Sequence, residues 1–425
     1  MNKLDRRIVP PSGDIHMPNF PEFETQTLPN GATLVVVHGG EQPIVKVDIV
    51  MRAGSLRADR ALVARATIQL LNEGTQTLTS RQIAEKTEFY GAYIWGAPNT
   101  GSTQLSMMCL QKDTRPMVEL LADILYNPIF PENELQLLKS LELQRFEVDK
   151  LRTPFVCTSK LQEVIYKAGG RYGRHKTADA INALSRQLLL DFYNEAYRPY
   201  DAIVCVSGQP SADDVKFIAE TFGVGWQDNG HHWSVPKAEY QAPQRVLVDM
   251  ESEQTSINMS RPLFGKNHED YFAFGVVDTI LGGYISSRLM QNLREKLGLT
   301  YGISSSVMSN VCDGLHQIRT EVRRGSHEQA LQEIQREMLR LCEENVSATE
   351  LDTVRSAMLG DILRMFNSPM ASAEALLALL TDHFTFDRIT NLYNTIKQIS
   401  ADEVRQMAQK WLVPDAYTTV IVGKL

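Results

Sequence analysis

Two adjoining stretches in the second half of the chain decide its fold: LGGYISSRL at Leu281–Leu289 and LREKLGLTY at Leu293–Tyr301. Leu289, Leu293 and Leu297 stand at i, i+4 and i+8, so they would form one apolar stripe along a helix. This spacing predicts an amphipathic helix that runs from the end of the first stretch into the second.

The residues that flank this helix predict where it begins and ends. Ser286 or Ser287 can cap its N-terminus through the side-chain hydroxyl. Gly298 can end it, because glycine tolerates the left-handed backbone of a C-terminal cap. Tyr301 then begins the stretch Tyr301–Ser305, which is predicted as a strand at the edge of a sheet.

The second half of the chain repeats the first at a nearly constant offset. Glu134-Leu135, at the start of one predicted long helix, matches Glu350-Leu351 at an offset of 216 residues. The predicted strand Val204–Gly208 matches Thr419–Gly423 at an offset of 215 residues. Such an offset is far longer than the period of a solenoid repeat. The sequence therefore predicts two copies of one α+β unit, each of about 200 residues in length.

The other landmarks fill in this arrangement. In the first half, strands are predicted at Thr33–Val37, Ile44–Val50 and Ala202–Val206, and helices from about Ala61 to Gly74, at Pro116–Tyr126 and at Glu132–Lys150. The polar stretch from Trp226 to Pro243 is typical of an exposed linker. We expect an N-terminal arm at 1–22, a first domain at 23–225, a linker at 226–243 and a second domain at 244–425.

Composition excludes several classes of protein. The chain has 425 residues, a net charge of −8, 43% hydrophobic residues and 22% charged residues, which is typical of a globular protein of two to three domains. An acidic balance argues against a dedicated nucleic-acid binder, which needs a basic surface. A membrane span needs about 20 consecutive apolar residues, and runs such as Ala375–Leu380 are much shorter.

The N-terminus and the cysteines predict the compartment. The charged segment Met1–Arg7 is followed by Pro10-Pro11, where a signal peptide would need an apolar stretch. Five scattered cysteines without a CxxC pair indicate reduced thiols rather than a disulfide framework. We expect a cytoplasmic protein, or a periplasmic one if a leader has been removed.

Several motifs together resemble the M16 family of insulinase, pitrilysin and mitochondrial processing peptidase. The motifs are Asn30-Gly31, Arg52–Ser55, Glu73–Thr75, Tyr197–Tyr200 and the long stretch Leu281–Tyr301, which is similar to the family's "SSRL…LREK.GLAY" segment. The resemblance implies two homologous M16-type α/β domains, each a mixed or antiparallel sheet flanked by helices, that together form half of a clamshell.

Active members of this family carry the inverted zinc motif H-x-x-E-H, in which two imidazoles one helical turn apart bind Zn²⁺ and the glutamate activates the bound water. The corresponding positions here are Arg65, Ile68 and Gln69. Arginine is permanently cationic, isoleucine cannot transfer a proton, and glutamine is a poor zinc ligand. The family's third ligand is a glutamate on a later helix, and Glu147 lies near its expected place. We expect no metal in this chain, and a solvated helix-face carboxylate at Glu147.

The family's second half supplies an arginine and a tyrosine that reach the substrate in the zinc-bearing half. They correspond to Arg294 and Tyr301, seven residues apart. A guanidinium can donate paired hydrogen bonds to a carboxylate or a peptide carbonyl. A phenol can donate to the oxyanion that develops when water attacks the scissile carbonyl. A surface ion pair for the arginine and a packed core position for the tyrosine are the alternative interpretation.

These features predict the non-catalytic subunit of a two-chain zinc-dependent peptidase. Its partner would be a homologous chain that carries H-x-x-E-H and the zinc, and the heterodimer would act on a peptide substrate. Two other interpretations stay open: a peptide-binding pseudopeptidase, alone or as a homodimer, and a structural scaffold without hydrolytic activity. His175 is expected to be structural, and His231-His232 to lie in a solvated loop.

Overall fold

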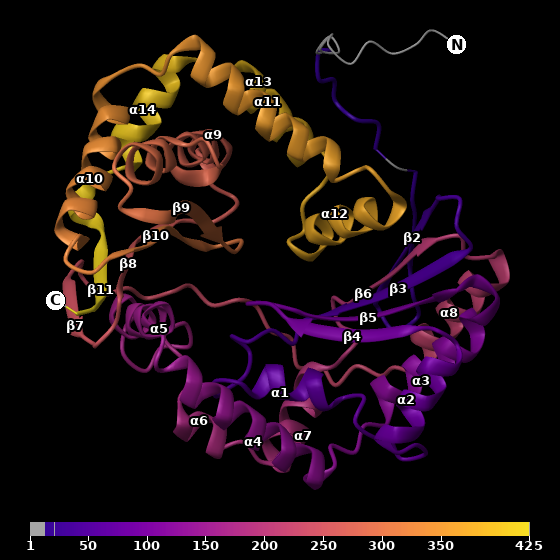
Figure 1. The fold of residues 1–425 in the computed structure, drawn as a ribbon. Coiled ribbons are helices and arrows are strands. Elements are labelled where there is room, and N and C mark those ends of the chain that lie inside the picture. Colours follow the sequence, from indigo (N-terminus) through magenta and orange to yellow (C-terminus); the bar gives the residue numbers. More distant parts are fainter. Residues whose placement is uncertain (1–12, 21, 425) are drawn as a thin grey trace, which may run out of the picture.

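Two β-sheets with the same strand order form the framework of the protein (Figure 1). The computed structural model describes residues 13–20 and 22–424, so most of the predicted arm at 1–22 lies outside the described residues. The first sheet contains β1 (Glu24–Thr27), β2 (Thr33–His38), β3 (Ile44–Met51), β4 (Tyr93–Pro98), β5 (Thr103–Leu110) and β6 (Ile203–Gly208). The second contains β7 (Arg245–Asp249), β8 (Gln254–Phe264), β9 (Thr300–Ser309), β10 (Asp313–Arg323) and β11 (Thr418–Gly423).

The strand orders confirm the duplication that the sequence predicts. The first sheet runs β1-β2-β6-β3-β5-β4 and the second runs β7-β11-β8-β10-β9. When β1 is left out, the first, last, second, fourth and third strands of each unit follow one another across both sheets. In each sheet the last strand of the unit makes the one parallel pair among the described strands, β6 with β2 and β11 with β7, and the other pairs are antiparallel. Each unit is therefore a mixed sheet flanked by helices.

Helices surround both sheets. The first unit has α1 (Val63–Leu70), α2 (Ser80–Phe89), α3 (Thr114–Tyr126), α4 (Glu132–Asp149), α5 (Thr153–Ile165), α6 (Ala178–Asn182), α7 (Arg186–Ala196) and α8 (Ala212–Val224). The second has α9 (Tyr271–Asp278), two π-helical segments η2 (Thr279–Gly283) and η3 (Met290–Lys296), α10 (His327–Glu343), α11 (Ala348–Arg364), α12 (Pro369–Thr381), α13 (Asp387–Gln398) and α14 (Ala401–Trp411). Short 3₁₀ turns lie at Gln111–Asp113 and Pro414–Ala416.

The predicted strands and long helices of the first half lie within two residues of the observed ones, but the helix expected to end at Gly74 is shorter. α1 ends at Leu70 and is preceded by Leu62 in the left-handed conformation. The backbone of Gly74 instead pairs with Thr79 in an isolated bridge. The first α-helix is thus a two-turn element, and the left-handed backbone of Leu62 prevents it from starting earlier.

Each unit covers one face of the other unit's sheet with a helix. α12 of the second unit packs on β2, β3 and β6 of the first sheet, and α5 of the first unit packs on β8 and β11 of the second (Figure 1). The first contact is a buried cluster of Val35, Val37, Val50, Ile203, Cys205, Ala373, Leu376 and Leu377. The second is a buried cluster of Cys157, Leu161, Val164, Ile165, Tyr166, Leu315, Val420 and Val422. The two halves are therefore joined by reciprocal apolar contacts.

Buried charge reinforces the first of these contacts. Lys46 on β3 forms ion pairs with Asp48, at 3.1 Å, and with Glu374 on α12, at 2.6 Å. Burial alone would lower the pKa of Lys46, but the two carboxylates outweigh it and raise the pKa. Arg52 donates a hydrogen bond of 2.7 Å to the backbone oxygen of Thr381 at the end of α12.

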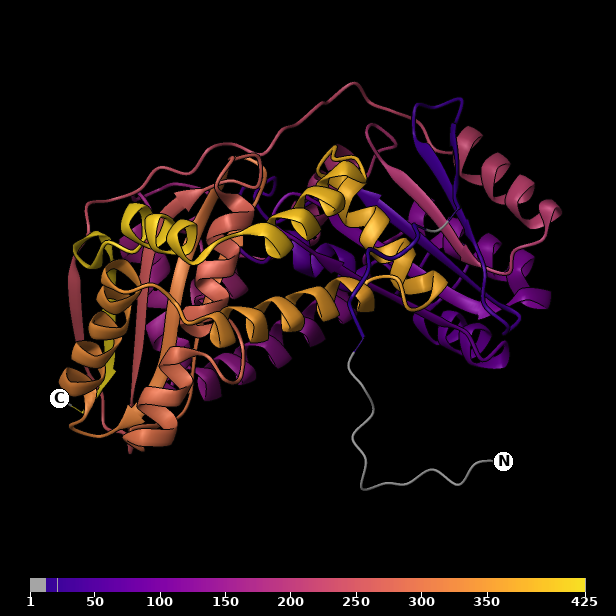
Figure 2. The same ribbon diagram turned by 90° about the horizontal axis from the view of Figure 1, so that it is seen from above.

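A connection without helix or long strand joins the two units. It runs from the end of α8 to β7 along one side of the molecule (Figure 2). Its Tyr240 stacks on Tyr166 next to α5, with ring centroids 5.4 Å apart. Among the helices of the described residues, we find none with the length and apolar composition needed to cross a membrane.

Candidate functional site

The residues at the zinc-motif positions lie on α1 at the wall of a large cavity. Arg65 is exposed and lines the cavity, and Gln69 is partly buried. Ile68 is 2% exposed and packs against β4, where its Cγ1 lies 2.5 Å from the place that a Cβ on Gly96 would occupy. The middle position of the motif is therefore filled by tight apolar packing, which Gly96 permits because it has no side chain.

A buried carboxylate on which the charge of Arg65 acts is already paired with other cations. Glu142 on α4 is buried and forms ion pairs with Lys176, at 2.8 Å, and Arg145, at 3.2 Å. Burial alone would raise the pKa of Glu142. The bonds and charges of these partners, together with the charge of Arg65, outweigh burial and lower the pKa.

The residues present do not fit a zinc ion. Zinc in proteins is bound by thiolate, neutral imidazole and carboxylate, whereas this site offers the guanidinium of Arg65, an alkyl group and the amide of Gln69. No three histidine, cysteine, aspartate or glutamate side chains are grouped to hold a metal within residues 13–20 and 22–424. We therefore derive no metal-dependent step in this chain.

The sequence pointed to Glu147 rather than Glu142. The Glu147 side chain is 58% exposed and pairs with Lys150, one turn further along α4. A solvated carboxylate is what the sequence predicts for this position. Glu142 could have been found from the helical period, because it lies one turn after Leu138, which packs against the core of the first unit.

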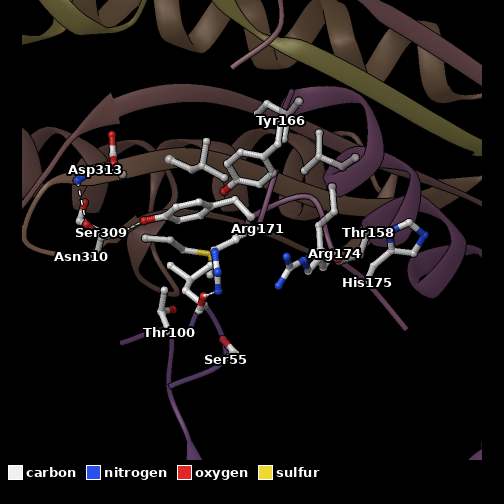
Figure 3. A pocket seen from close by; sticks show the side chains of 18 of the residues that line it. Ser55, Thr100, Thr158, Tyr166, Arg171, Arg174, His175, Ser309, Asn310 and Asp313 are labelled. Atoms are coloured by element: carbon white, nitrogen blue, oxygen red, sulfur yellow. Dashed lines mark hydrogen bonds between the residues drawn. The ribbon is translucent and has the colours of Figure 1, made fainter. Parts of the chain in front are cut away.

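The cavity beside α1 has a volume of about 780 Å³ and lies between the two units. Residues of the first unit, such as Arg60, Arg65 and Arg174, line one side, and residues of β9 and β10 line the other. Figure 3 shows Arg171 and Arg174 in this space on the same side as Ser55, and the guanidinium groups of both donate to the backbone oxygen of Ala58. His175 lines the cavity as well, and its Nδ1 lies 3.1 Å from the backbone oxygen of Gly173.

The signature stretch Leu281–Tyr301 folds into a π-helical segment that leads into an edge strand. In η3 the backbone N–H of Leu297 donates to the oxygen of Asn292, five residues earlier. Gly298 ends the segment with φ of +59°, as predicted. β9 is the last strand of its sheet, which confirms the predicted edge strand at Tyr301.

Two expectations about this segment are wrong. Leu289 and Leu293 are buried, but Leu297 is exposed, because π-helical winding advances each residue by less than the α-helical angle and turns Leu297 away from the stripe. The hydroxyl of Ser287 is buried without a hydrogen-bond partner among the described residues, so it caps nothing. The backbone oxygen of Ser286 instead accepts a bond of 2.8 Å from the Gln291 side chain.

Other contacts hold the segment in place. Arg288 donates two hydrogen bonds, of 2.8 and 2.9 Å, to Glu350 at the start of α11. A Cβ on Gly282 would lie 2.6 Å from the backbone nitrogen of Ser305, so only glycine allows η2 to pack this closely on β9. The segment is thus fixed on its inner side.

Arg294 and Tyr301 lie on the outer side of this segment. Arg294 is exposed, and Tyr301 is 89% exposed. Neither side chain forms an ion pair or hydrogen bond with the described part of the chain. Neither lines the cavity beside α1. The structure therefore does not bring this pair together with Arg65, Ile68 and Gln69.

His231 and His232 in the linker both contact residues of the first unit. The ring of His232 stacks on Tyr200 with centroids 3.6 Å apart. The backbone oxygen of His231 accepts a bond of 3.1 Å from Arg57.

Comparison with known families covers both units. Residues 34–172 match the family described as "Insulinase (Peptidase family M16)", and residues 183–358 match "Peptidase M16 inactive domain". The chain belongs to peptidase family M16. This confirms the resemblance seen in the signature stretch.

Relatives and solved structures of similar length agree with this M16 assignment. The chain is 22% identical to an "Uncharacterized zinc protease YmxG" of Bacillus subtilis, over 92% of this chain and 95% of the relative. It is also 22% identical to an "Uncharacterized zinc protease" of Rickettsia felis, over 94% and 97%. A peptidase M16 inactive domain from Pseudomonas fluorescens superposes with a TM-score of 0.88 at 22% identity, over 95% of this chain and 98% of that one. A protease from Helicobacter pylori superposes with a TM-score of 0.85 at 16% identity, over 95% and 100%. At these identities the superpositions establish the two-unit M16 fold.

Proposed function

We propose that this M16 chain is the non-catalytic subunit of a two-chain zinc-dependent peptidase. Its partner is a homologous chain that carries H-x-x-E-H. Arg294 and Tyr301 bind the peptide substrate and stabilise the transition state in the partner's active site.

The observation that carries this proposal is the exposed surface of the signature stretch. Ile285 is 72% exposed and Tyr301 is 89% exposed, and Leu297 is also exposed. Large apolar side chains that are exposed in one stretch of the chain are a feature of binding surfaces. Here they accompany Arg294, a cation without a partner in the described residues. The inner side of the same stretch is tightly packed, so the outer side is presented on a rigid support.

The chemistry of the pair fits the handling of a peptide bond. The guanidinium of Arg294 can donate two parallel hydrogen bonds to a carbonyl or carboxylate of the substrate and so orient it. The hydroxyl of Tyr301 can donate a hydrogen bond to the oxyanion that forms at the scissile carbonyl. Bound in the partner, zinc would supply the activated water.

The same pair supports a two-chain rather than a one-chain enzyme. Arg294 and Tyr301 are absent from the lining of the chain's own cavity beside α1. That cavity carries an arginine at position 65, where a zinc enzyme needs a ligand. A second chain would supply the zinc ligands that are missing at position 65. Its active site would bind the exposed side chains of Arg294 and Tyr301.

The proposal also places the protein in a reducing compartment such as the cytoplasm. All five cysteines are free thiols in the structure, and three of them, Cys109, Cys157 and Cys205, are buried.

Cleavage of a quenched fluorescent peptide library tests the proposal. The partner is taken from M16 chains with H-x-x-E-H that are encoded next to this one. We expect no cleavage by this chain alone and metal-dependent cleavage by the mixture. Tyr301→Phe in the mixture lowers turnover by about 10²-fold, the effect of losing one oxyanion donor. Tyr200→Phe, which keeps its ring stacked on His232, is the matched control and leaves turnover unchanged.

An inactive mixture across a broad library would contradict the proposal and would favour a peptide-binding pseudopeptidase or a scaffold. Unchanged turnover in Tyr301→Phe would contradict the proposal that the Tyr301 hydroxyl stabilises the oxyanion. Cleavage by this chain alone, abolished by chelation, would contradict the absence of a zinc site.

A further inference from the structure

The cavity between the two units carries a large excess of positive charge. Seven arginine and lysine side chains line it, and Asp313 is the one carboxylate among the lining residues that the structure describes. The whole protein has a net charge of −8. The cations are therefore concentrated at this place against the overall balance of the chain.

Three of the seven cations are neutralised by carboxylates outside the lining. Arg171 pairs with Asp59, at 2.9 Å, and Lys176 pairs with Glu142, at 2.8 Å. Lys266 pairs with Asp382 in the same way. In each of these ion pairs a carboxylate of the protein balances the positive charge of the lining residue.

The other four cations, Arg60, Arg65, Arg174 and Arg319, form no ion pair with any described residue. Arg174 donates to the backbone oxygen of Ala58, and Arg319 donates to the Gln317 amide oxygen. Neutral acceptors satisfy hydrogen bonds but cancel no charge. Burial, followed by repulsion from neighbouring Arg171, lowers the pKa of Arg174. The nearest carboxylates act on these cations only without direct contact, Asp59 on Arg174 and Glu142 on Arg65, and each of the two forms its ion pair with another cation.

Asp313 does not serve as a counterion to these four arginines. Its carboxylate accepts a hydrogen bond of 2.7 Å from the backbone N–H of Ala238. It lies with Asn310 and Ser309 at one end of the cavity, away from Arg174 in Figure 3. Apart from Asp313, no carboxylate lies among the described residues that line the cavity.

The remaining wall is apolar and aromatic. Met308, which is 54% exposed, and the partly buried Leu62 and Val307 contribute alkyl surface. The partly buried Tyr172 and Tyr240 contribute rings. A volume of about 780 Å³ lies within the range of about 300–1,000 Å³ that is typical of ligand sites. A small inorganic anion would leave this apolar wall uncovered. A peptide segment would cover it with its side chains while its carboxylates meet the arginines.

We propose that this cavity binds an acidic peptide segment, whose carboxylates pair with the four arginines that form no ion pair within the described residues. The proposal rests on the proposed function in that it takes the ligand to be a peptide. It adds a second binding place, separate from the surface of Arg294 and Tyr301, and a preference for acidic sequence. The carboxylates can come from glutamate side chains or from the C-terminus of the peptide.

Calorimetric titration of the full chain, without a partner, tests the proposal. The probes are a nine-residue peptide with four glutamates, its counterpart with four glutamines, and both again with an amidated C-terminus. We expect the glutamate peptide to bind at least tenfold more tightly than the glutamine peptide, and its affinity to fall as salt is raised. A loss on amidation assigns part of the binding to the C-terminal carboxylate, and equal binding assigns it to the side chains.

Variants locate the binding in the cavity. Arg60 and Arg65 are exposed and make no hydrogen bond or ion pair with the described residues, so Arg60→Gln with Arg65→Gln removes charge without breaking an internal hydrogen bond. We expect this double variant to lose about tenfold per arginine, in the range of a charge-assisted hydrogen bond. Arg323→Gln, at an exposed arginine outside the cavity, is the matched control and keeps the affinity.

Equal affinity for the glutamate and glutamine peptides, or equal affinity in the double variant and the control, would overturn the proposal. These outcomes are independent of the cleavage assay, because no partner and no turnover are involved. A mixture that cleaves peptides while the chain alone shows no acidic preference would sustain the proposed function and reject the cavity. An inactive mixture with acidic preference retained would do the reverse.

Discussion

Replacing Ile68 by glutamate should destabilise the protein strongly, although glutamate is the family's residue at this motif position. The side chain of Ile68 is 2% exposed, and it lies directly over Gly96 on β4. A glutamate there would lose the apolar contact and would bring a carboxyl group into the core of the first unit. The surrounding residues pack around an alkyl side chain, so a glutamate at position 68 would not be placed to act on a zinc-bound water.

The size of the effect follows from two contributions. Removing a fully buried isoleucine side chain costs about 1.5–3 kcal/mol in transfer free energy. Burying a polar group without a partner costs about 1–3 kcal/mol more. Together they predict a loss of about 2.5–6 kcal/mol in the free energy of unfolding, which is a large part of the 5–15 kcal/mol typical of a folded protein.

The loss should also depend on pH. Burial disfavours the carboxylate, so the pKa of a glutamate at position 68 is raised in the folded state above its unfolded value of about 4.3. Above that pH the folded state binds more protons than the unfolded state, and stability falls as pH rises until the folded pKa is passed. The deficit of the variant is therefore larger at pH 7 than at pH 4.5.

Urea unfolding followed by circular dichroism measures both effects, with the parent chain measured at the same two pH values. Ile68→Gln is the matched control, because it loses the same apolar contact but cannot titrate, and its deficit should be equal at both pH values. Arg65→His, at an exposed position, should stay within about 0.5 kcal/mol of the parent. A deficit of Ile68→Glu below about 1 kcal/mol, or one that does not change with pH, would refute the packing argument.

Three other measurements check the contacts and chemistry described above. Leu376→Ala on α12 and Leu161→Ala on α5 each remove a buried side chain from the two reciprocal clusters, and each should cost about 2–5 kcal/mol in urea unfolding. An aromatic disulfide reagent at pH 8 should label exposed Cys312 rapidly and leave Cys157 unlabelled, because burial raises the pKa of Cys157 to about 12; Cys312→Ser should abolish the rapid phase. Metal analysis after dialysis should find no stoichiometric zinc in the isolated chain, and a chelator should leave its unfolding midpoint unchanged.

The repeated unit could be predicted from the sequence because its signals are local. Strands such as Ile44–Met51 and helices such as Glu132–Asp149 carry their own period and turn residues, and the offset of about 215 residues relates the two halves. The identity of α5 and α12 as helices is likewise local. Their placement on the opposite unit's sheet is not, because an apolar helix face does not specify which apolar sheet face it covers.

For the candidate site, too, local features could be predicted from the sequence and long-range ones could not. Arg294 and Tyr301 could be found from a contiguous motif, although their exposure could not. Leu297 is exposed because the segment is a π-helix, with hydrogen bonds between residues five apart. The spacing of the apolar residues does not predict this type of helix. The cationic cavity brings together segments as distant as Arg60 and Arg319, each an ordinary surface arginine in the linear sequence.

The exchange of helices constrains how the cavity can work. A movement of one unit against the other would lift α12 from the first sheet and α5 from the second, and would expose both buried clusters to water. It would also separate the buried Lys46 from Glu374 and leave its charge with one partner fewer. The penalty for such opening is large because both clusters are lost together, so the two walls of the cavity are held at a fixed separation. A backbone framework of fixed shape loses little conformational entropy when a ligand binds. For the peptide binding proposed above, selectivity then depends on how many carboxylates of the peptide can reach the arginine side chains of this framework.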